Sequence, residues 1–423
     1  MSDLTKPAVP FSALGRRAKA PTIARLMNAA LENPALLSLA AGFTDSATLP
    51  LPAVTAAAQR LAVRGDRESL QYGPNQGRPR LRAMMAGHLQ RREPALDAGL
   101  LSRQLFITNG SQQALYLAMQ VLCEPGDIVL VDRPSYFVFL EMLTGMGVEA
   151  VSVPVDHDGR VDAAALADRL TALKQAGQSH RIKALYFVSY FSNPSSRSLT
   201  VTEKQTLARV LKEQDLIVPV IEDAAYRDLF FASPPEAPSI LSLEEWGGFP
   251  RLYLSTLTKS FATGLKIGYG CCTDDAWLAA MLHTKGHHDF GSANHLQALL
   301  EEVLAGGSLE EQLQIIRPVY ARKMQTLHET LVGAGLQKTG WRWTAPAGGL
   351  YLWLEAPALL DTGLESGFCR RCIAEGVLYV PGELCFGDDV PRNFVRLSYG
   401  VLAERELAEA GRRFVRVAQA AGN

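Results

Sequence analysis

Lys259 lies in a setting that favours covalent chemistry. It belongs to residues 255–270, a stretch rich in hydroxyls and glycines, between the apolar residues 251–254 and 267–272, which are typical of buried strands. Because burial disfavours the ammonium form, such a lysine can become a neutral amine and a nucleophile toward aldehydes. A loop lysine that reaches solvent fits this stretch equally well. The choice between the two interpretations depends on residues upstream.

A second apolar stretch, residues 217–221, ends in Glu222 and Asp223 and is followed by Tyr226. Carboxylates at the carboxyl ends of strands in an open α/β sheet lie where ligands bind, although Asp223 alone would be read as a helix cap. Together with Lys259, Asp223 indicates pyridoxal phosphate, which needs a lysine for a Schiff base and an acidic partner for its ring nitrogen. The carboxylate would keep that nitrogen protonated, so that the ring accepts electrons from the substrate's α-carbon.

Residues 106–115 read as a strand, a tight turn and a helix, with Ser111 and Gln112 just after the turn. Free backbone N–H groups and the positive end of the helix dipole make such a turn a phosphate site. It is not a Walker A loop, because the Gly-Lys-Ser/Thr ending is absent. Turns with Gly-Ser are common, so this one supports the cofactor only in combination with Lys259 and Asp223.

A series of short motifs extends along nearly the whole chain. They lie at residues 72–77, 110–115, 134–136, 192–194, 222–226, 255–270, 346–353, 379–382 and 393–397. Each is modest alone, but their shared order and spacing is hard to obtain by chance. From about residue 21 to its last helix, the chain therefore resembles the class I/II aminotransferase family of fold-type I pyridoxal-phosphate enzymes, and most of all its 2-aminoadipate/kynurenine aminotransferase-like branch.

The resemblance implies roles for residues around the cofactor ring. Lys259 would form the Schiff base and later move the proton between the substrate's α-carbon and the cofactor. Asp223 would pair with the ring nitrogen, and Tyr136 would stack on the ring. Tyr226 and Asn193 would hydrogen-bond its 3′ oxygen.

Further roles are implied at the phosphate and at the substrate. The residues implied near the phosphate are Ser111, Gln112, Thr256, Thr258, Lys266 and Tyr72. Tyr72 would come from the neighbouring subunit of a homodimer with shared active sites. Arg396 would clamp the substrate's α-carboxylate with its planar fork, beside Asn193 and the backbone of Gly42.

Arg25 is a candidate for recognising the substrate's side chain, with an ordinary surface arginine as the alternative. Tyr186 and Tyr190 are candidates for facing the cofactor, and strand alternation does not choose between them.

Two residues depart from the family's usual pattern. Lys266 stands where an arginine is usual beside the phosphate, so a point charge replaces a bidentate fork and we expect weaker cofactor binding. Ser196 stands where the Asn-Pro-x-Gly turn has its glycine, so we expect the local backbone to differ. Neither change removes a catalytic group, and the resemblance implies an active enzyme.

Short apolar strands alternate with helix-like stretches between about residues 52 and 305. The predicted strands are 105–108, 128–131, 150–153, 184–188, 218–222, 252–254 and 267–271. This alternation predicts an α/β fold, with a mostly parallel seven-stranded sheet covered by helices. Strands at 350–354, 377–380 and 394–398 predict a smaller α+β domain. Capping boxes at Thr200 and Ser308 predict two helix starts, the second for a helix to about residue 332.

We expect an N-terminal arm and helix at 1–50 that pack with the small domain, a pyridoxal-phosphate domain at 51–305 and the small domain at 306–423. A net charge of −1 gives no electrostatic case for nucleic acid or an anionic membrane. Without a bilayer-spanning apolar run or a signal-peptide core, a cytoplasmic protein is expected. Neither the Cys369 and Cys372 pair nor the His287 and His288 pair has further ligands at suitable spacing, so no metal is expected.

The leading hypothesis is an aminotransferase that works in two half-reactions. An amino acid leaves its amino group on the cofactor and departs as a 2-oxo acid, and a second oxo acid takes the amino group. A β-lyase or a decarboxylase is the alternative, because fold and cofactor do not choose the reaction. A non-catalytic sensor of pyridoxal phosphate is a less favoured hypothesis. Such regulators carry a basic DNA-binding domain, for which a match from about residue 21 leaves no room.

Overall fold

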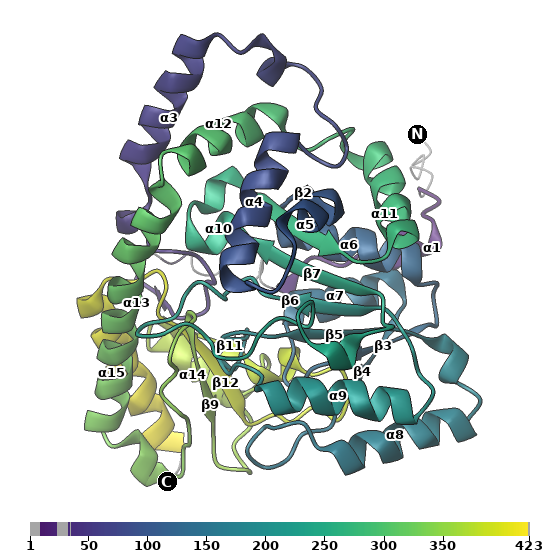
Figure 1. Cartoon of the computed structure of the whole chain (residues 1–423). Coiled ribbons are helices and arrows are strands. Elements are labelled where there is room, and N and C mark those ends of the chain that lie inside the picture. The colour runs from purple at the N-terminus through teal and green to yellow at the C-terminus, as the bar shows by residue number, and fades with distance from the viewer. Residues whose placement is uncertain (1–8, 23–32, 34, 422–423) are drawn as a thin grey trace, which may run out of the picture.

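The computed structural model describes residues 9–22, 33 and 35–421, and seven of its strands form one central sheet (Figure 1). The strand order is β2-β8-β7-β6-β5-β3-β4. The bounds are Leu105–Asn109 (β2), Ile128–Val131 (β3), Glu149–Ser152 (β4), Ile182–Val188 (β5), Val220–Asp223 (β6), Arg251–Thr256 (β7) and Ile267–Cys272 (β8). Strands β4, β3, β5, β6 and β7 pair in parallel, whereas β8 is antiparallel to both neighbours. The predicted mostly parallel sheet is confirmed.

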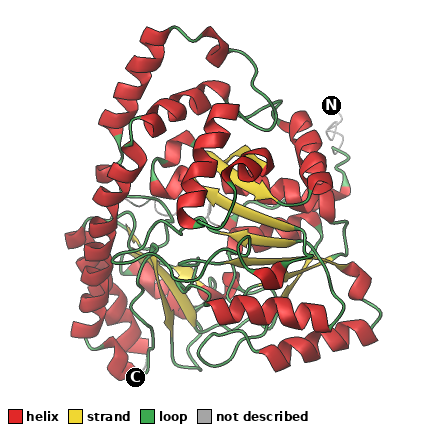
Figure 2. Cartoon of the chain, in the orientation of Figure 1, coloured by secondary structure: helices red, strands yellow, loops and turns green. Residues whose placement is uncertain are grey.

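Helices cover both faces of this sheet (Figure 2). On one face, α8 (Ala163–Gln175) and α9 (Val201–Glu213) pack on alternate strand residues such as Leu130 and Leu185. On the other face the neighbouring residues Val131 and Tyr186 join a second apolar cluster. That cluster includes residues of α4 (Pro79–Arg92), α6 (Gly110–Leu122), α7 (Phe137–Met146), α11 (Asp275–His288) and α12 (Asn294–Ala305). Burial on both faces explains why the strands read as continuous apolar runs.

A smaller group of elements lies at one side of the sheet, at the lower left of Figure 1. Its three-stranded antiparallel sheet has the order β11-β12-β9, with bounds Val380–Pro381 (β11), Phe394–Ser398 (β12) and Tyr351–Glu355 (β9). Its helices are α13 (Ser308–Gly333), α14 (Gly367–Ala374) and α15 (Glu404–Ala421). The other described α-helices are α1 (Ala13–Arg17), α3 (Leu51–Arg64), α5 (Ala98–Gln104) and α10 (Leu257–Ser260). No helix in the described part of the chain is long and apolar enough to cross a membrane.

The prediction of one strand at 377–380 is wrong. Val377–Leu378 (β10) pairs in parallel with Leu37–Ser38 (β1), whereas Val380–Pro381 (β11) pairs with β12. The chain changes partner at Tyr379, which is fully buried and donates its hydroxyl to the carbonyl oxygen of Thr362 at 2.7 Å. The apolar residues 377–381 therefore form two short strands, each in a different sheet.

One of the two predicted capping boxes forms. The Thr200 side chain accepts from the backbone N–H of Glu203, and the Glu203 carboxylate accepts from the backbone N–H of Thr200. The box at Ser308 is wrong, because Ser308 is the first helical residue and Gly307 precedes it with a left-handed φ of 75°. Helix α12 ends at Ala305, so only Gly306 and Gly307 separate the two helices.

Candidate active site

Lys259 lies at the carboxyl end of β7, on the short helix α10 that begins after Thr256. Its Nζ donates to the carbonyl oxygen of Gly42 at 2.6 Å. Burial lowers the pKa of Lys259 to about 8, and the charges of Lys266 and Arg396 add to this effect. A substantial fraction of this amine is therefore neutral near pH 8, as a nucleophile or a base requires.

Asp223 ends β6, the neighbour of β7 in the sheet. Its carboxylate accepts from the backbone N–H of Ala225 at 3.0 Å and from the hydroxyl of Tyr186 at 3.2 Å. Burial raises the pKa of Asp223 to about 6, although both hydrogen bonds lower it. No lysine, arginine or histidine of the described residues pairs with this carboxylate. It therefore suits a cationic partner such as the protonated ring nitrogen of pyridoxal phosphate.

Tyr186 and Tyr190, the two candidates for facing the cofactor, lie in different surroundings. Tyr186 donates a hydrogen bond to Asp223, and its ring packs at a tilt against Phe139 with ring centroids 4.0 Å apart. The Tyr190 hydroxyl instead donates to the carbonyl oxygen of Ala237 and accepts from Lys204. Only Tyr186 contacts a residue that the cofactor would need.

The turn before α6 lies against β8. Gly110 has a φ of 69°, and a Cβ on Gly268 would lie only 2.4 Å from its carbonyl carbon and 2.5 Å from the nitrogen of Ser111. Ser111 and Gln112 occupy the first turn of α6, where backbone N–H groups have no intrahelical acceptor. The Thr256 and Thr258 hydroxyls hydrogen-bond each other at 2.9 Å. Lys266 follows Leu265 with a left-handed φ of 53°. The turn, the two threonines and Lys266 offer N–H, hydroxyl and ammonium groups of the kind that bind phosphate.

Arg396 projects from β12 and is 1% exposed. Its Nη1 donates to Asn193 Oδ1 at 2.8 Å, and its Nη2 donates to the carbonyl oxygen of Ala40 at 2.6 Å. Its Nε has no partner among the described residues. A buried guanidinium with an unused N–H is suited to a carboxylate that enters from outside the chain.

Tyr226, Tyr136 and Tyr351 form the aromatic part of the site. Burial raises the pKa of Tyr226 well above its ordinary value, and burial likewise raises the pKa of Tyr136. The hydroxyls of Tyr226 and Tyr351 lie 3.1 Å apart. Tyr351 was missed in the sequence, although it lies inside the motif at 346–353. The available signal was a tyrosine two residues after the glycine pair 348–349, within an otherwise apolar run.

Other predicted residues lie apart from this cluster. Tyr72 is 80% exposed and packs edge to face on Phe290, with centroids 5.4 Å apart. No hydrogen bond, ion pair or ring contact joins Tyr72 to the described residues around Lys259. Arg25 lies outside the described residues.

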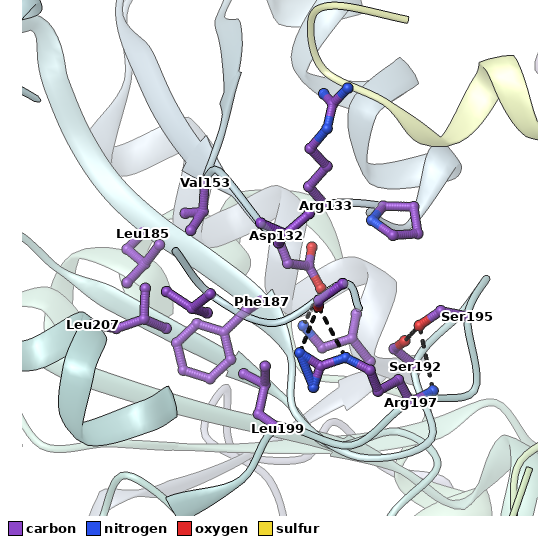
Figure 3. Close-up of a pocket in the computed structure, with 15 residues that line it drawn as sticks. Asp132, Arg133, Val153, Leu185, Phe187, Ser192, Ser195, Arg197, Leu199 and Leu207 are labelled. Carbon is purple, nitrogen blue, oxygen red and sulfur yellow. Dashed lines mark hydrogen bonds between the residues drawn. The ribbon is translucent and has the colours of Figure 1, made fainter. Parts of the chain in front are cut away.

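A small cavity of about 40 Å³ lies beside the site, between the end of β3 and residues 192–199 (Figure 3). It has room for about one or two water molecules, too little for a cofactor. Asp132 lines it and accepts from the Ser135 hydroxyl at 2.5 Å and from the Val188 N–H at 2.9 Å. Burial raises the pKa of Asp132 to about 7. These bonds attach the turn that carries Tyr136 to the end of β5.

Comparisons with known proteins agree on one family. The aminotransferase class I and II family matches residues 34–414. A 2-aminoadipate transaminase of Thermus thermophilus is 30% identical over 401 residues, which cover 95% of this chain and 94% of that protein. A Pyrococcus horikoshii kynurenine aminotransferase structure matches with a TM-score of 0.86 and 26% identity, over 97% of both chains. The α-aminoadipate aminotransferase of Thermus thermophilus, complexed with N-(5′-phosphopyridoxyl)-L-leucine, matches with a TM-score of 0.80 and 29% identity, over 97% of both chains.

Proposed function

This chain belongs to the class I and II aminotransferases, and from that premise we propose which of its residues perform the reaction. It is a pyridoxal-phosphate-dependent enzyme of fold type I that moves an amino group between an amino acid and a 2-oxo acid. When bound, pyridoxal phosphate supplies an electron sink for the bonds at the substrate's α-carbon. The protein supplies binding, orientation and proton transfer.

The placement of Lys259 and Arg396 carries the proposal. Lys259 donates to the carbonyl oxygen of Gly42, and Arg396 donates to that of Ala40. One short backbone segment thus holds both the amine and the guanidinium. An α-amino acid has its carboxylate two bonds from its α-proton, so Arg396 would bind the carboxylate while Lys259 takes the proton from the adjacent carbon.

Lys259 acts as the proton carrier in this proposal. Its pKa of about 8 leaves the Nζ partly neutral at neutral pH, so it can accept a proton and return it. Burial excludes water that would otherwise exchange with this proton. Burial is the larger cause of this low pKa, and the positive charges of Lys266 and Arg396 lower it further.

The remaining site residues would hold and polarise the cofactor. Asp223 would pair with the ring nitrogen, Tyr136 would cover the ring, and Tyr226 and Asn193 would bond its 3′ oxygen. The residues that would hold the phosphate are Ser111, Gln112, Thr256, Thr258 and Lys266. The uncompensated carboxylate of Asp223 and the close approach of Gly268 to the Ser111 turn support this assignment.

We propose a homodimer with shared active sites, in which Tyr72 reaches the phosphate of the partner subunit. The exposed aromatic pair Tyr72 and Phe290 supports this, because the two residues are 80% and 63% exposed. We also propose residues 51–305 as the cofactor-binding domain, 306–423 as the small domain and 1–50 as an arm and helix against it. A cytoplasmic location is proposed because all six cysteines are free and buried, as in reducing compartments.

The proposed amino donors are L-amino acids with long dicarboxylic or aromatic side chains. The names of the relatives support this range, since one acts on 2-aminoadipate and another on kynurenine. Recognition of the α-carboxylate by Arg396 is common to all such donors and does not distinguish among them.

A visible absorbance titration tests the proposal. The purified protein with added pyridoxal phosphate is expected to show a visible band that donor amino acids convert to a shorter-wavelength band, and a 2-oxo acid should restore it. Borohydride reduction should attach the cofactor to the peptide that contains Lys259, and Lys259→Ala should abolish this attachment. Attachment of the cofactor to a peptide without Lys259 in the wild-type protein would contradict the assignment. The exposed Lys174 gives the matched control, because Lys174→Ala should leave the band and the attachment unchanged.

A further inference from the structure

We propose that Tyr351 is a positioning residue of this enzyme, which directs the hydroxyl proton of Tyr226 into the site and fixes the plane of the Arg396 guanidinium, and that Ser196 sets its place. The inference rests on the proposed function and extends it to residues for which that function gives no role. It depends on three contacts of Tyr351, made by its hydroxyl, its ring and its backbone carbonyl.

The contact between the hydroxyls of Tyr351 and Tyr226 limits where their two protons can point. Tyr226 and Tyr351 are 6% and 1% exposed, and their hydroxyl oxygens lie 3.1 Å apart. Among the described residues, neither hydroxyl has another hydrogen-bond partner. One proton therefore serves the bond between them, and the second is left for a group in the site. If Tyr351 donates, Tyr226 keeps its own proton free for the 3′ oxygen of the cofactor, and the two bonds strengthen each other.

The ring contact fixes Arg396. The guanidinium carbon lies 4.3 Å from the ring centroid of Tyr351 and 5.4 Å from that of Phe137. The two Nη atoms are held by Asn193 and Ala40, and the Nε–H is left unused. A guanidinium covered by aromatic rings has little freedom to rotate out of its plane, so its unused donor keeps one direction.

The backbone contact explains a departure from the family pattern. Ser196, in place of the usual glycine, has a left-handed φ of 52°, and its Oγ donates to the carbonyl oxygen of Tyr351 at 2.8 Å. Glycine would adopt this backbone at lower cost but would leave that carbonyl without the hydroxyl. Serine at position 196 therefore strains the turn, but its hydroxyl fixes the strand that carries Tyr351.

The small size of Gly42 leaves room for the hydroxyl of Tyr351. A Cβ at position 42 would lie 2.9 Å from the Tyr351 hydroxyl oxygen, so a larger residue would displace the hydroxyl. Gly42 also accepts the hydrogen bond from Lys259. The hydroxyl of Tyr351 thus fits between Tyr226 and the segment that holds the catalytic amine.

Tyr351→Phe removes only the hydroxyl, and Tyr379→Phe is its matched control. Tyr379 is also fully buried and donates to a carbonyl oxygen, that of Thr362, at 2.7 Å. Both variants should lower the thermal midpoint of the cofactor-free protein. Only Tyr351→Phe should weaken binding of pyridoxal phosphate, by about 3- to 10-fold for one lost hydrogen bond.

A spectroscopic readout separates positioning from packing. The groups that face Tyr226 are Tyr351, Tyr136 and Arg396, and of these Tyr351 shares a hydrogen bond with it. Tyr351→Phe should move the pH midpoint of the cofactor's visible band upward, because a weaker donor at the 3′ oxygen stabilises its anionic form less. Tyr379→Phe should leave that midpoint unchanged. In a Tyr226→Phe background, Tyr351→Phe should produce no further shift.

Ser196→Gly keeps the turn and removes its hydroxyl, so it tests the backbone contact without a risk to folding. It should retain the thermal midpoint and raise KM for the amino donor more than it lowers kcat, as a looser Arg396 requires. Identical spectra and cofactor affinities for Tyr351→Phe and Tyr379→Phe would overturn the inference while leaving the proposed function intact. A wild-type protein without any visible band would overturn both.

Discussion

The low pKa of Lys259 has a direct consequence for its reactivity in the cofactor-free protein. With a pKa of about 8 instead of 10.5, roughly a quarter of Lys259 is neutral at pH 7.5, a fraction on the order of a hundred times that of an ordinary lysine. Competitive acylation followed by peptide mass spectrometry measures this for every lysine in one sample. The exposed Lys174 serves as the internal reference.

The cause of the low pKa can be separated by one substitution. Lys266→Met removes a positive charge near Lys259, so the midpoint of Lys259 acylation should rise. It should stay below the ordinary value, because burial is the larger cause and is unchanged. Lys174→Met is the matched control and should leave the midpoint of Lys259 where it was. A wild-type midpoint at or above pH 10 would refute the reasoning.

The same pKa predicts how stability depends on pH. The folded protein binds Lys259's proton more weakly than the unfolded chain, so this residue destabilises the fold most below about pH 8, and the effect disappears as the pH rises toward 10.5. The low pKa corresponds to a destabilisation of the folded protein by about 3 kcal/mol, and the hydrogen bond from Lys259 to Gly42 offsets about 1 kcal/mol of it. Lys259→Met should therefore raise the free energy of unfolding by about 2 kcal/mol at pH 7, and by less at pH 10. Urea unfolding at the two pH values measures this, and a less stable variant at pH 7 would contradict it.

Two further substitutions test the supports of the site. Gly268→Ala should lower the free energy of unfolding by about 1–3 kcal/mol and weaken cofactor binding, because its Cβ would collide with the turn at Gly110. Gly145→Ala is the control. A Cβ there meets no atom within 4 Å, so this variant should not lower the free energy of unfolding. Lys204→Met should cost about 3–5 kcal/mol in urea unfolding, because it leaves the fully buried carboxylate of Glu222 unpaired. A loss below 1 kcal/mol in either single variant would contradict its stated cause.

Local patterns in the sequence predicted the central sheet well. Strands covered on both faces read as apolar runs, and each of the seven predicted runs overlaps a strand of the sheet. The capping box at Thr200 was also predictable, since both of its bonds join residues three positions apart. The failures at Ser308 and at 377–380 have a different cause. There, Gly307 and the sheet partners of two short strands determined the outcome, and neither is visible in the local pattern.

The sequence by itself determined which groups could react: a lysine and an aspartate at the ends of buried strands, a glycine turn before a helix, and an arginine in a late strand. The tertiary structure decided how they act together. It brought the hydroxyl of Tyr351 to Tyr226 across 125 positions and the hydroxyl of Ser196 to the Tyr351 carbonyl across 155. Periodicity and turn chemistry report only neighbours in the chain. The pKa of Lys259 and the direction of the Arg396 donor depend instead on burial and on charges that only folding brings together.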